Sequence, residues 1–150
     1  MTRSITRLAD FLPYRLSITS NAVSDLIARE YRTRFGLKIP EWRVMAVLGD
    51  VGEATQRELV AATRMDKVAV NRATKTLGER ALIQRAPNMA DGRSHHLALT
   101  AAGQALYAEI MPLALQMEAQ IMTALDDKER AQLSALMNKL LARADALTDD

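Results

Sequence analysis

Residues 55–100 decide the fold, and they read TQRELVAATRMDKVAVNRATKTLGERALIQRAPNMADGRSHHLALT. Near the start of this stretch, Thr55 and Glu58 have the spacing of a capping box, so the sequence predicts a short helix over about residues 56–63. Asp66 belongs to a residue type that caps helices well, and apolar residues recur after it at intervals of three and four. A second helix is therefore expected shortly after the first.

A β-hairpin is predicted after the second helix, which ends at about residue 80. Residues 82–86 and 95–100 are strand-like, and a polar turn over residues 87–94 separates them. Two short helices followed by a hairpin are the element order of a winged helix-turn-helix. In that fold one helix enters the DNA major groove and the hairpin tip lies against the flanking backbone or minor groove. The predicted fold class is mainly α with a small β wing.

The charge distribution agrees with a nucleic-acid partner for this part of the chain. The formal net charge of the chain is only +2, but residues 55–93 contain eight Lys and Arg against four acidic residues. Residues 109–150 have the reverse balance, with four basic and eight acidic residues. A local positive surface attracts phosphates, and binding releases their counterions. A merely solvated charged face is the alternative interpretation.

Long helices are predicted on both sides of the winged lobe. Apolar spacing indicates one helix over about residues 8–36, and two helices over about 101–148 with a break at residues 126–128. We expect Pro112 to kink the first of these two or to mark an irregular turn. Their apolar faces are too large for a lobe of about residues 40–99 to cover, so we expect a two-fold homodimer with the termini at its interface. Packing of these helices within one monomer is the alternative.

Composition narrows the class of protein further. The chain has 150 residues, no cysteine, 49% hydrophobic and 25% charged residues, which is typical of one globular domain without disulfides or thiolate metal sites. It contains no apolar run near the roughly 18 residues of a membrane span, and we expect a cytoplasmic protein without a signal peptide. The sequence shows no nucleophile–base pair, metal triad or glycine-rich phosphate loop, so we expect neither an enzyme nor a cofactor.

Several motifs resemble those of the multiple-antibiotic-resistance (MarR) family of regulators, over about residues 10–145. The resemblance implies a single MarR-type chain that acts as a homodimeric, usually repressing, transcription factor on a pseudo-palindromic operator. It also implies release by a small, often aromatic effector bound between the dimerisation helices and the DNA-binding lobe. The matching motifs are PEWRVMAVL (40–48), TQREL (55–59), DK (66–67), VNR (70–72), LGERALI (77–83), DGR (91–93) and LALTAAG (97–103).

Two positions depart from the family pattern. The wing of the family usually reads Asp-Arg-Arg, and Gly92 replaces the middle Arg, which removes one possible phosphate contact and weakens the case for a tightly bound wing. The glycine that usually ends the recognition helix is Ala81 here. Because alanine adopts a left-handed conformation less readily, we expect a differently shaped helix end. Neither change affects the predicted fold.

The second helix of the lobe carries the residues expected to contact bases. Asn71 can form a bidentate pair with adenine, and Arg72 or Lys67 can bind guanine or phosphate. Val68 or Ala69 can contact a thymine methyl group. For each basic residue, a solvated surface charge is the alternative.

Five further residues are expected to contact DNA outside the base-reading positions. Lys75 is predicted to meet phosphate, as are Gln56 and Arg57 at the start of the first helix. Arg93 is the candidate for the minor groove at the wing tip, with Ser94 beside it. The DNA-binding prediction therefore extends over both helices and the wing.

Arg15 and Trp42 are the candidate effector-binding residues. Arg15 on the first helix can bind the carboxylate or phosphate of an acidic effector, and it can equally face solvent. Trp42 can line an effector pocket or belong to the core. Residues 35–43 resemble the corresponding stretch of family members that answer to aromatic acids or their coenzyme A thioesters.

Two other functions stay open at this point. A winged-helix protein-interaction module without DNA binding has the same element order. A metal-responsive regulator would use His95, His96 and nearby carboxylates. Neighbouring residues on a strand face opposite sides of the sheet, which disfavours chelation of one metal ion by both imidazoles.

Overall fold

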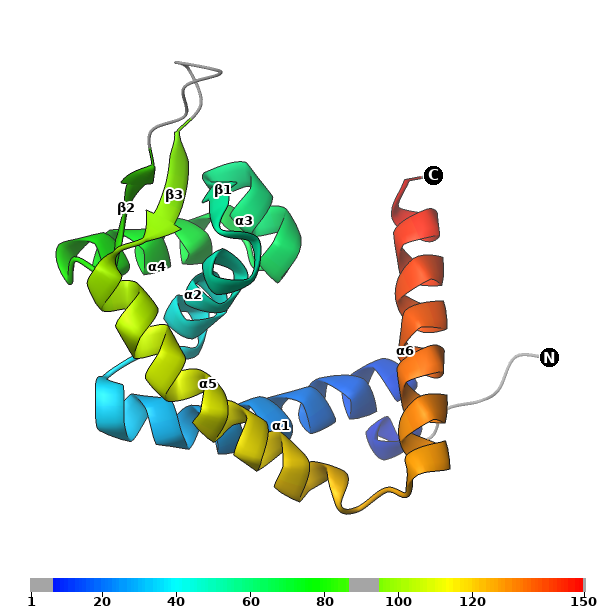
Figure 1. Ribbon diagram of the computed structural model, residues 1–150. Helices are drawn as coiled ribbons and strands as arrows, with labels where there is room; N and C mark the ends of the chain where they lie inside the picture. Colours follow the sequence, from blue (N-terminus) through cyan, green and yellow to red (C-terminus); the bar gives the residue numbers. More distant parts are fainter. Residues whose placement is uncertain (1–6, 87–94, 150) are drawn as a thin grey trace. The chain divides into compact units, whose positions relative to one another are not determined.

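The computed structural model describes residues 7–86 and 95–149, and it is mainly helical with a small antiparallel sheet (Figure 1). The chain divides into two compact units, and the boundary between Ala114 and Leu115 falls inside a helix. The elements are the 3-10 helix η1 (Leu8–Asp10), α1 (Leu12–Phe35), α2 (Ile39–Val51), β1 (Glu53–Thr55), α3 (Gln56–Thr63), α4 (Lys67–Glu79), β2 (Ile83–Ala86), β3 (His96–Leu99), α5 (Ala101–Met122) and α6 (Asp127–Thr148).

The first long helix begins later than the expected residue 8. Helix α1 starts at Leu12, with Pro13 in its first turn, and the short η1 precedes it. A proline fits there because the first-turn N–H groups of a helix have no intrahelical partner. At the other end Gly36 adopts a left-handed φ of 63°, and its N–H donates to the Arg32 carbonyl. The predicted end of this helix is confirmed.

Both helices of the predicted helix-turn-helix have the expected caps. Thr55 Oγ1 accepts the Glu58 N–H at 3.1 Å, and the Glu58 carboxylate accepts the Thr55 N–H at 3.4 Å, which completes the capping box of α3. Asp66 Oδ1 accepts the Ala69 N–H at 2.7 Å and caps α4. The predicted boundaries of both helices agree with the structure to within a residue.

The sheet has the strand order β1–β3–β2, and both pairs are antiparallel. The hairpin strands β2 and β3 were predicted, although each is shorter than its predicted stretch. Strand β1 was not predicted, because its three residues, the last of which is also the cap of α3, are too few to show an alternating pattern. It pairs Thr55 with His96 and thereby joins the start of α3 to the hairpin.

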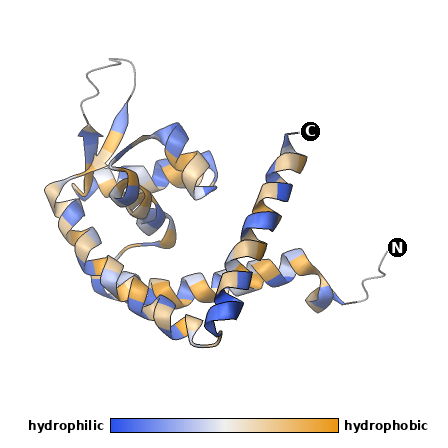
Figure 2. Ribbon diagram, turned by 45° about the vertical axis from the view of Figure 1, so that its right-hand side comes forward, coloured by the Kyte–Doolittle hydropathy of each residue, from blue (hydrophilic) through white to orange (hydrophobic). Residues whose placement is uncertain are grey.

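The core of the first unit lies between α2, α3, α4 and the sheet. Its largest fully buried side chains are Leu37, Met45, Leu48, Leu59, Leu77, Ile110, Val44 and Val70. Hydrophobic positions in α2 and the strands form this core, while hydrophilic positions lie on the outer surfaces of α3 and α4 (Figure 2). The first unit therefore closes this core with residues from its own helices and strands, including Tyr31 of α1 and Ile110 of α5.

The second unit contains the end of α5 and all of α6. The predicted break between these helices is confirmed, and Asp126 caps α6 with Oδ1 at 2.8 Å from the Glu129 N. Arg130 donates through Nε and Nη2 to the carbonyl of Met122. Helix α5 continues through Pro112, so the proline does not end it. Among the described residues, no helix is both long enough and apolar enough to cross a membrane.

Candidate nucleic-acid interface

The outer face of α4 presents polar and basic side chains, because the inner face is committed to the core. Val70, Ala73, Thr74 and Leu77 are buried at spacings of three and four residues. Most other residues of the helix are exposed, whereas Ala69 and Thr76 are half-buried. The exposed ones include Lys67, Val68, Asn71, Arg72 and Lys75. The Val68 side chain is 59% exposed, so this face also presents one apolar group.

Helix α3 contributes two of the predicted contact residues, and the structure places them differently. Arg57 is exposed, whereas Gln56 is half-buried. Gln56 Nε2 donates to Thr74 Oγ1 at 2.7 Å, and Thr74 Oγ1 donates to the Asn71 carbonyl at 3.1 Å. The structure thus uses one end of the Gln56 amide to join α3 to α4, which the sequence did not reveal.

Hollows flank the outer face of α4 on two sides. One, of about 350 Å³, lies between α4 and the hairpin, and Asn71, Lys75 and Arg85 are among its lining residues. The other, of about 480 Å³, lies between α4 and the start of α2, and Lys38 and Arg72 are among its lining residues. The first combines cationic side chains with open surface, which suits an anionic backbone, whereas the second also has Glu41 and Glu79 in its lining.

The remaining interface candidates are at the wing. Arg93 and Ser94, together with Gly92, lie outside the described residues. The strands that lead into this segment are described, and Arg85 on β2 is exposed next to Lys75 in the hollow beside α4. Sequence analysis did not single out Arg85, although a basic residue at an outward position of a wing strand was a usable signal.

Trp42 lies in a row of three aromatic rings, contributed by α1, α2 and α5. Its ring centroid is 5.6 Å from that of Tyr31 and 5.8 Å from that of Tyr107. Burial raises the pKa of the Tyr31 phenol, and Arg43 and Arg32 oppose that shift. A methyl group on Gly49 would lie 2.6 Å from the Tyr107 ring, so that ring packs directly on the backbone of α2.

A small cavity of about 150 Å³ opens beside Trp42. Its lining residues are Ser24, Ile27, Tyr31, Ile39, Trp42 and Arg43. Arg15, the other effector candidate, is exposed on the first half of α1 and is not part of this lining. The structure therefore does not bring the two predicted effector residues together in one cavity.

The histidines next to the wing do not form part of a metal cluster in the described structure. His95 is exposed and His96 is half-buried on β3. Across residues 7–86 and 95–149, no three His, Cys, Asp or Glu side chains gather in a position to hold a metal ion.

Comparison with known proteins identifies the class of this fold. A family model described as the MarR family matches residues 35–94. The transcriptional repressor NicR of Pseudomonas putida is 31% identical over 97 residues, which are 65% of this chain and 61% of the repressor. The chain thus spans less than two thirds of that relative's length.

Solved structures extend the similarity over nearly the whole chain. A MarR/EmrR family transcriptional regulator from Acinetobacter sp. ADP1 has a TM-score of 0.86 and 26% identity, and the match covers 93% of this chain and 99% of that one. BpsR of Bordetella bronchiseptica, whose DNA binding is regulated by 6-hydroxynicotinic acid, has a TM-score of 0.79 and 23% identity, with 91% and 97% covered.

These matches and the element order define a winged-helix protein of the kind found in transcriptional regulators. Residues 35–94 are thus similar to the MarR family, and the chain shares the fold of MarR/EmrR family transcriptional regulators.

Proposed function

We propose that this protein is a ligand-responsive repressor that binds a pseudo-palindromic DNA operator as a homodimer. The observation that carries the proposal is the outer face of α4, where Asn71, Arg72 and Lys75 are exposed while the residues between them are buried. An amide and two cations on one helical face supply adenine and guanine readout together with phosphate contact.

The dimer is inferred from apolar surface at both ends of the described chain. On α6, Leu133, Leu136 and Leu140 are 40%, 56% and 47% exposed. On η1 and the first half of α1, the side chains of Leu8 and Leu12 are 59% and 50% exposed. A second copy of the chain would cover such surface, and a two-fold dimer would present two recognition helices to two operator half-sites.

The effector is proposed to be a small aromatic acid or its acyl-coenzyme A thioester. The cavity beside Trp42 supports the acid, because it offers aromatic faces from Tyr31 and Trp42 and a guanidinium from Arg43. Its volume of about 150 Å³ suits a single ring, so the larger part of a thioester would lie outside it. The regulation of BpsR by a hydroxylated pyridine acid agrees with this class. Arg15 lies outside this lining, so Arg43 is the guanidinium proposed to meet the acidic group within one protomer.

Binding to DNA is tested by fluorescence anisotropy with a duplex from the region upstream of the protein's own coding sequence. The purified protein is titrated across a salt series, against a scrambled duplex of the same composition. We expect preferential binding to the native duplex and a steep salt dependence. Asn71→Ala should lower that preference by about 1–3 kcal/mol, and Lys75→Ala should weaken binding to both duplexes and reduce the salt slope.

The controls are matched substitutions on α6. Asn138→Ala and Lys139→Ala remove the same functional groups from exposed positions far along the sequence from α4, and they should leave binding unchanged. Absence of binding by the unsubstituted protein at low salt would favour a protein-interaction module instead. Binding that appears only after zinc is added, and disappears with a chelator, would favour a metal-responsive regulator.

Release from DNA is tested with the same complex. At least one of three compounds, namely 6-hydroxynicotinic acid, benzoate and benzoyl-coenzyme A, should dissociate the protein from the duplex. Trp42→Leu should weaken the response while leaving DNA affinity without the compound unchanged. If none of a panel of aromatic acids and thioesters causes release, the aromatic effector is wrong although the DNA-binding proposal stands.

A further inference from the structure

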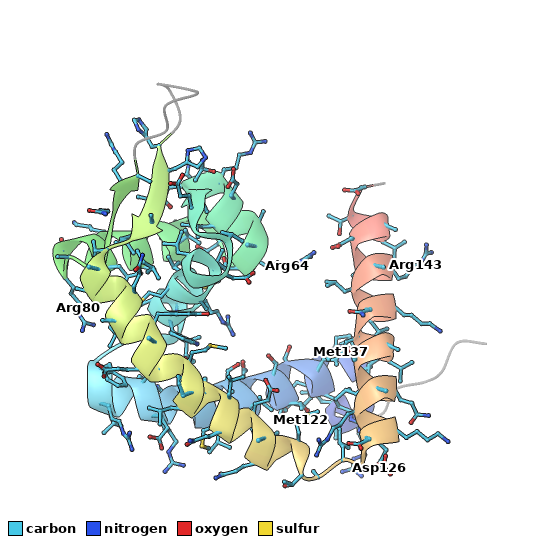
Figure 3. The ribbon with its side chains drawn as sticks, viewed as in Figure 1. Arg64, Arg80, Met122, Asp126, Met137 and Arg143 are labelled. Atoms are coloured by element: carbon cyan, nitrogen blue, oxygen red, sulfur yellow. The ribbon has the colours of Figure 1, made fainter. Side chains whose placement is uncertain are left out.

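The turn that follows the recognition helix is bound to both of the long helices of the first unit. We define this junction turn as residues Arg80–Leu82, between α4 and β2. It lies at the end of α4 nearest to α1 and α5, and Figure 3 labels Arg80 there. Arg80 contacts the end of α1, and Ala81 and Leu82 contact the start of α5.

Arg80 joins the end of α4 to the end of α1. Its Nη2 donates to the Phe35 carbonyl at 2.9 Å and its Nη1 to the Gly36 carbonyl at 3.3 Å. These carbonyls are at the C-terminus of α1, where the partial negative charge of a helix favours a cation. The planar guanidinium can reach both oxygens at once, which an ammonium group cannot do in the same geometry.

Ala81 and Leu82 join the same turn to the start of α5. Thr100 Oγ1 donates to the Ala81 carbonyl at 2.7 Å and accepts the Gly103 N–H at 3.0 Å. The Thr100 N–H donates to the Leu82 carbonyl at 3.0 Å. A methyl group on Gly103 would collide with the Leu82 carbonyl oxygen, so α5 touches the backbone of the turn.

The turn itself has little freedom to absorb a displacement. Ala81 has a φ of 56°, in the left-handed region that disfavours residues with a Cβ atom. Its N–H donates to the Gly78 carbonyl at 3.0 Å, and the Leu82 N–H donates to the Leu77 carbonyl at 2.9 Å. Those two bonds form a Schellman motif, which holds the turn rigidly on the last turn of α4.

We propose that the junction turn transmits the position of α1 and α5 to the recognition helix, with Arg80 as its main positioning residue. This inference rests on the proposed function, because it assigns to the turn the coupling between the helix pair and DNA binding. Coupling between two sites is reciprocal. Binding of DNA to α4 must therefore alter how often the C-terminal end of α1 unfolds locally.

Hydrogen exchange with mass spectrometry on the full chain tests that reciprocity, with and without the duplex from its upstream region. In the unsubstituted protein, DNA should slow exchange in peptides covering α4 and also, by about fivefold, in peptides covering residues 31–37. Arg80→Gln should abolish the slowing at residues 31–37, and Arg80→Lys should reduce it, while α4 stays protected in both. A merely structural role would change exchange at residues 31–37 equally with and without DNA.

The matched control is Arg34→Gln, which removes a cation from the same end of α1 but leaves the Arg80 bonds in place. It should retain the DNA-dependent slowing. The α5 contact is tested in the same way with peptides covering the start of α5, where DNA should also slow exchange. Thr100→Val removes the hydrogen bond to Ala81 and should reduce that slowing, and Thr100→Ser should retain it. These variants also keep the test decisive if Arg80→Gln does not fold.

Two results would overturn the inference. Protection of α4 by DNA without any change at residues 31–37 in the unsubstituted protein would show that α4 and the C-terminal end of α1 are not coupled. Full DNA-dependent slowing in both Arg80→Lys and Thr100→Val would show that the coupling uses another route. In either case the DNA-binding proposal survives, whereas absence of protection at α4 itself would overturn that proposal and this inference with it.

Discussion

In the first unit α4 buries its apolar stripe and, apart from Val68, exposes mainly polar or charged side chains, whereas α6 in the second unit buries no residue at all. The apolar residues of α6 nonetheless recur at three and four, as in a helix that packs against something (Figure 2). The two helices therefore need different partners. The amphipathic face of α4 is satisfied inside its own unit, and its outer face suits an anion, while α6 has an apolar face that suits protein.

The largest effect is expected from a cavity in the first unit. Leu77→Ala removes a side chain that is 0% exposed at the centre of the α4 stripe, and it should lower the free energy of unfolding by about 3 kcal/mol. Denaturant unfolding should show that loss at every protein concentration. Leu133→Ala on α6 removes the same atoms from a position 40% exposed, and within a monomer it should have a much smaller effect. Equal losses of unfolding free energy in the two variants at low protein concentration would contradict the expected difference between α4 and α6.

The second prediction concerns association through α6. The double substitution Leu136→Asp and Leu140→Asp places two charges on its apolar face, and it should weaken the dimer by about 2 kcal/mol, or roughly thirtyfold. Sedimentation velocity over a range of concentrations measures this change. Asn138→Asp adds a charge to the opposite side of the same helix and should leave the dimer intact. A dimer of unchanged affinity in the double variant would place the interface elsewhere.

A third prediction separates DNA contact from stability. Arg93→Ala should weaken operator binding about tenfold, which corresponds to about 1.4 kcal/mol, because a wing-tip cation is lost from the minor groove. Thermal unfolding should not change. Anisotropy at moderate salt measures the affinity, with Lys139→Ala as the charge-matched control. Unchanged affinity would remove the wing from the interface and leave α4 as the main contact.

The smallest effect should be a gain in stability. Ala81→Gly relieves the left-handed conformation at the end of α4, and after the greater entropy of glycine in the unfolded chain is subtracted we expect about 0.5–1 kcal/mol. Ala61→Gly, at an exposed position inside α3, should lower stability by a similar amount. Denaturant midpoints measure both. Destabilisation by Ala81→Gly would mean that the alanine methyl makes a favourable contact that outweighs its strain.

Local signals account for the parts of the fold that could be predicted. The capping box of α3 and the Asp66 cap of α4 act over three residues, so the sequence defines both helix starts. The inward stripe of α4 follows from its periodicity of three and four residues, and it consists of the buried residues Val70, Ala73, Thr74 and Leu77.

Features that depend on distant residues could not be predicted. Strand β1 exists because it pairs with β3, more than 40 residues later, and nothing within its three residues requires it. The same holds for the hydrogen bond between Gln56 and Thr74. Gln56 was predicted to contact phosphate, but its amide nitrogen donates to Thr74 of the same chain. At Ala81 the expectation of an altered helix end is wrong. The alanine keeps the left-handed conformation because Schellman bonds and Thr100 hold it there.

The row of aromatic rings at Tyr31, Trp42 and Tyr107 has one more consequence. Trp42 is the single tryptophan of the chain, and it lies between rings from α1 and α5. Its emission spectrum, excited where tyrosine does not absorb, reports the environment at that place alone. The protein thus contains its own optical probe at the contact of α2 with α1 and α5, where a shift of these long helices would change the surroundings of the indole ring.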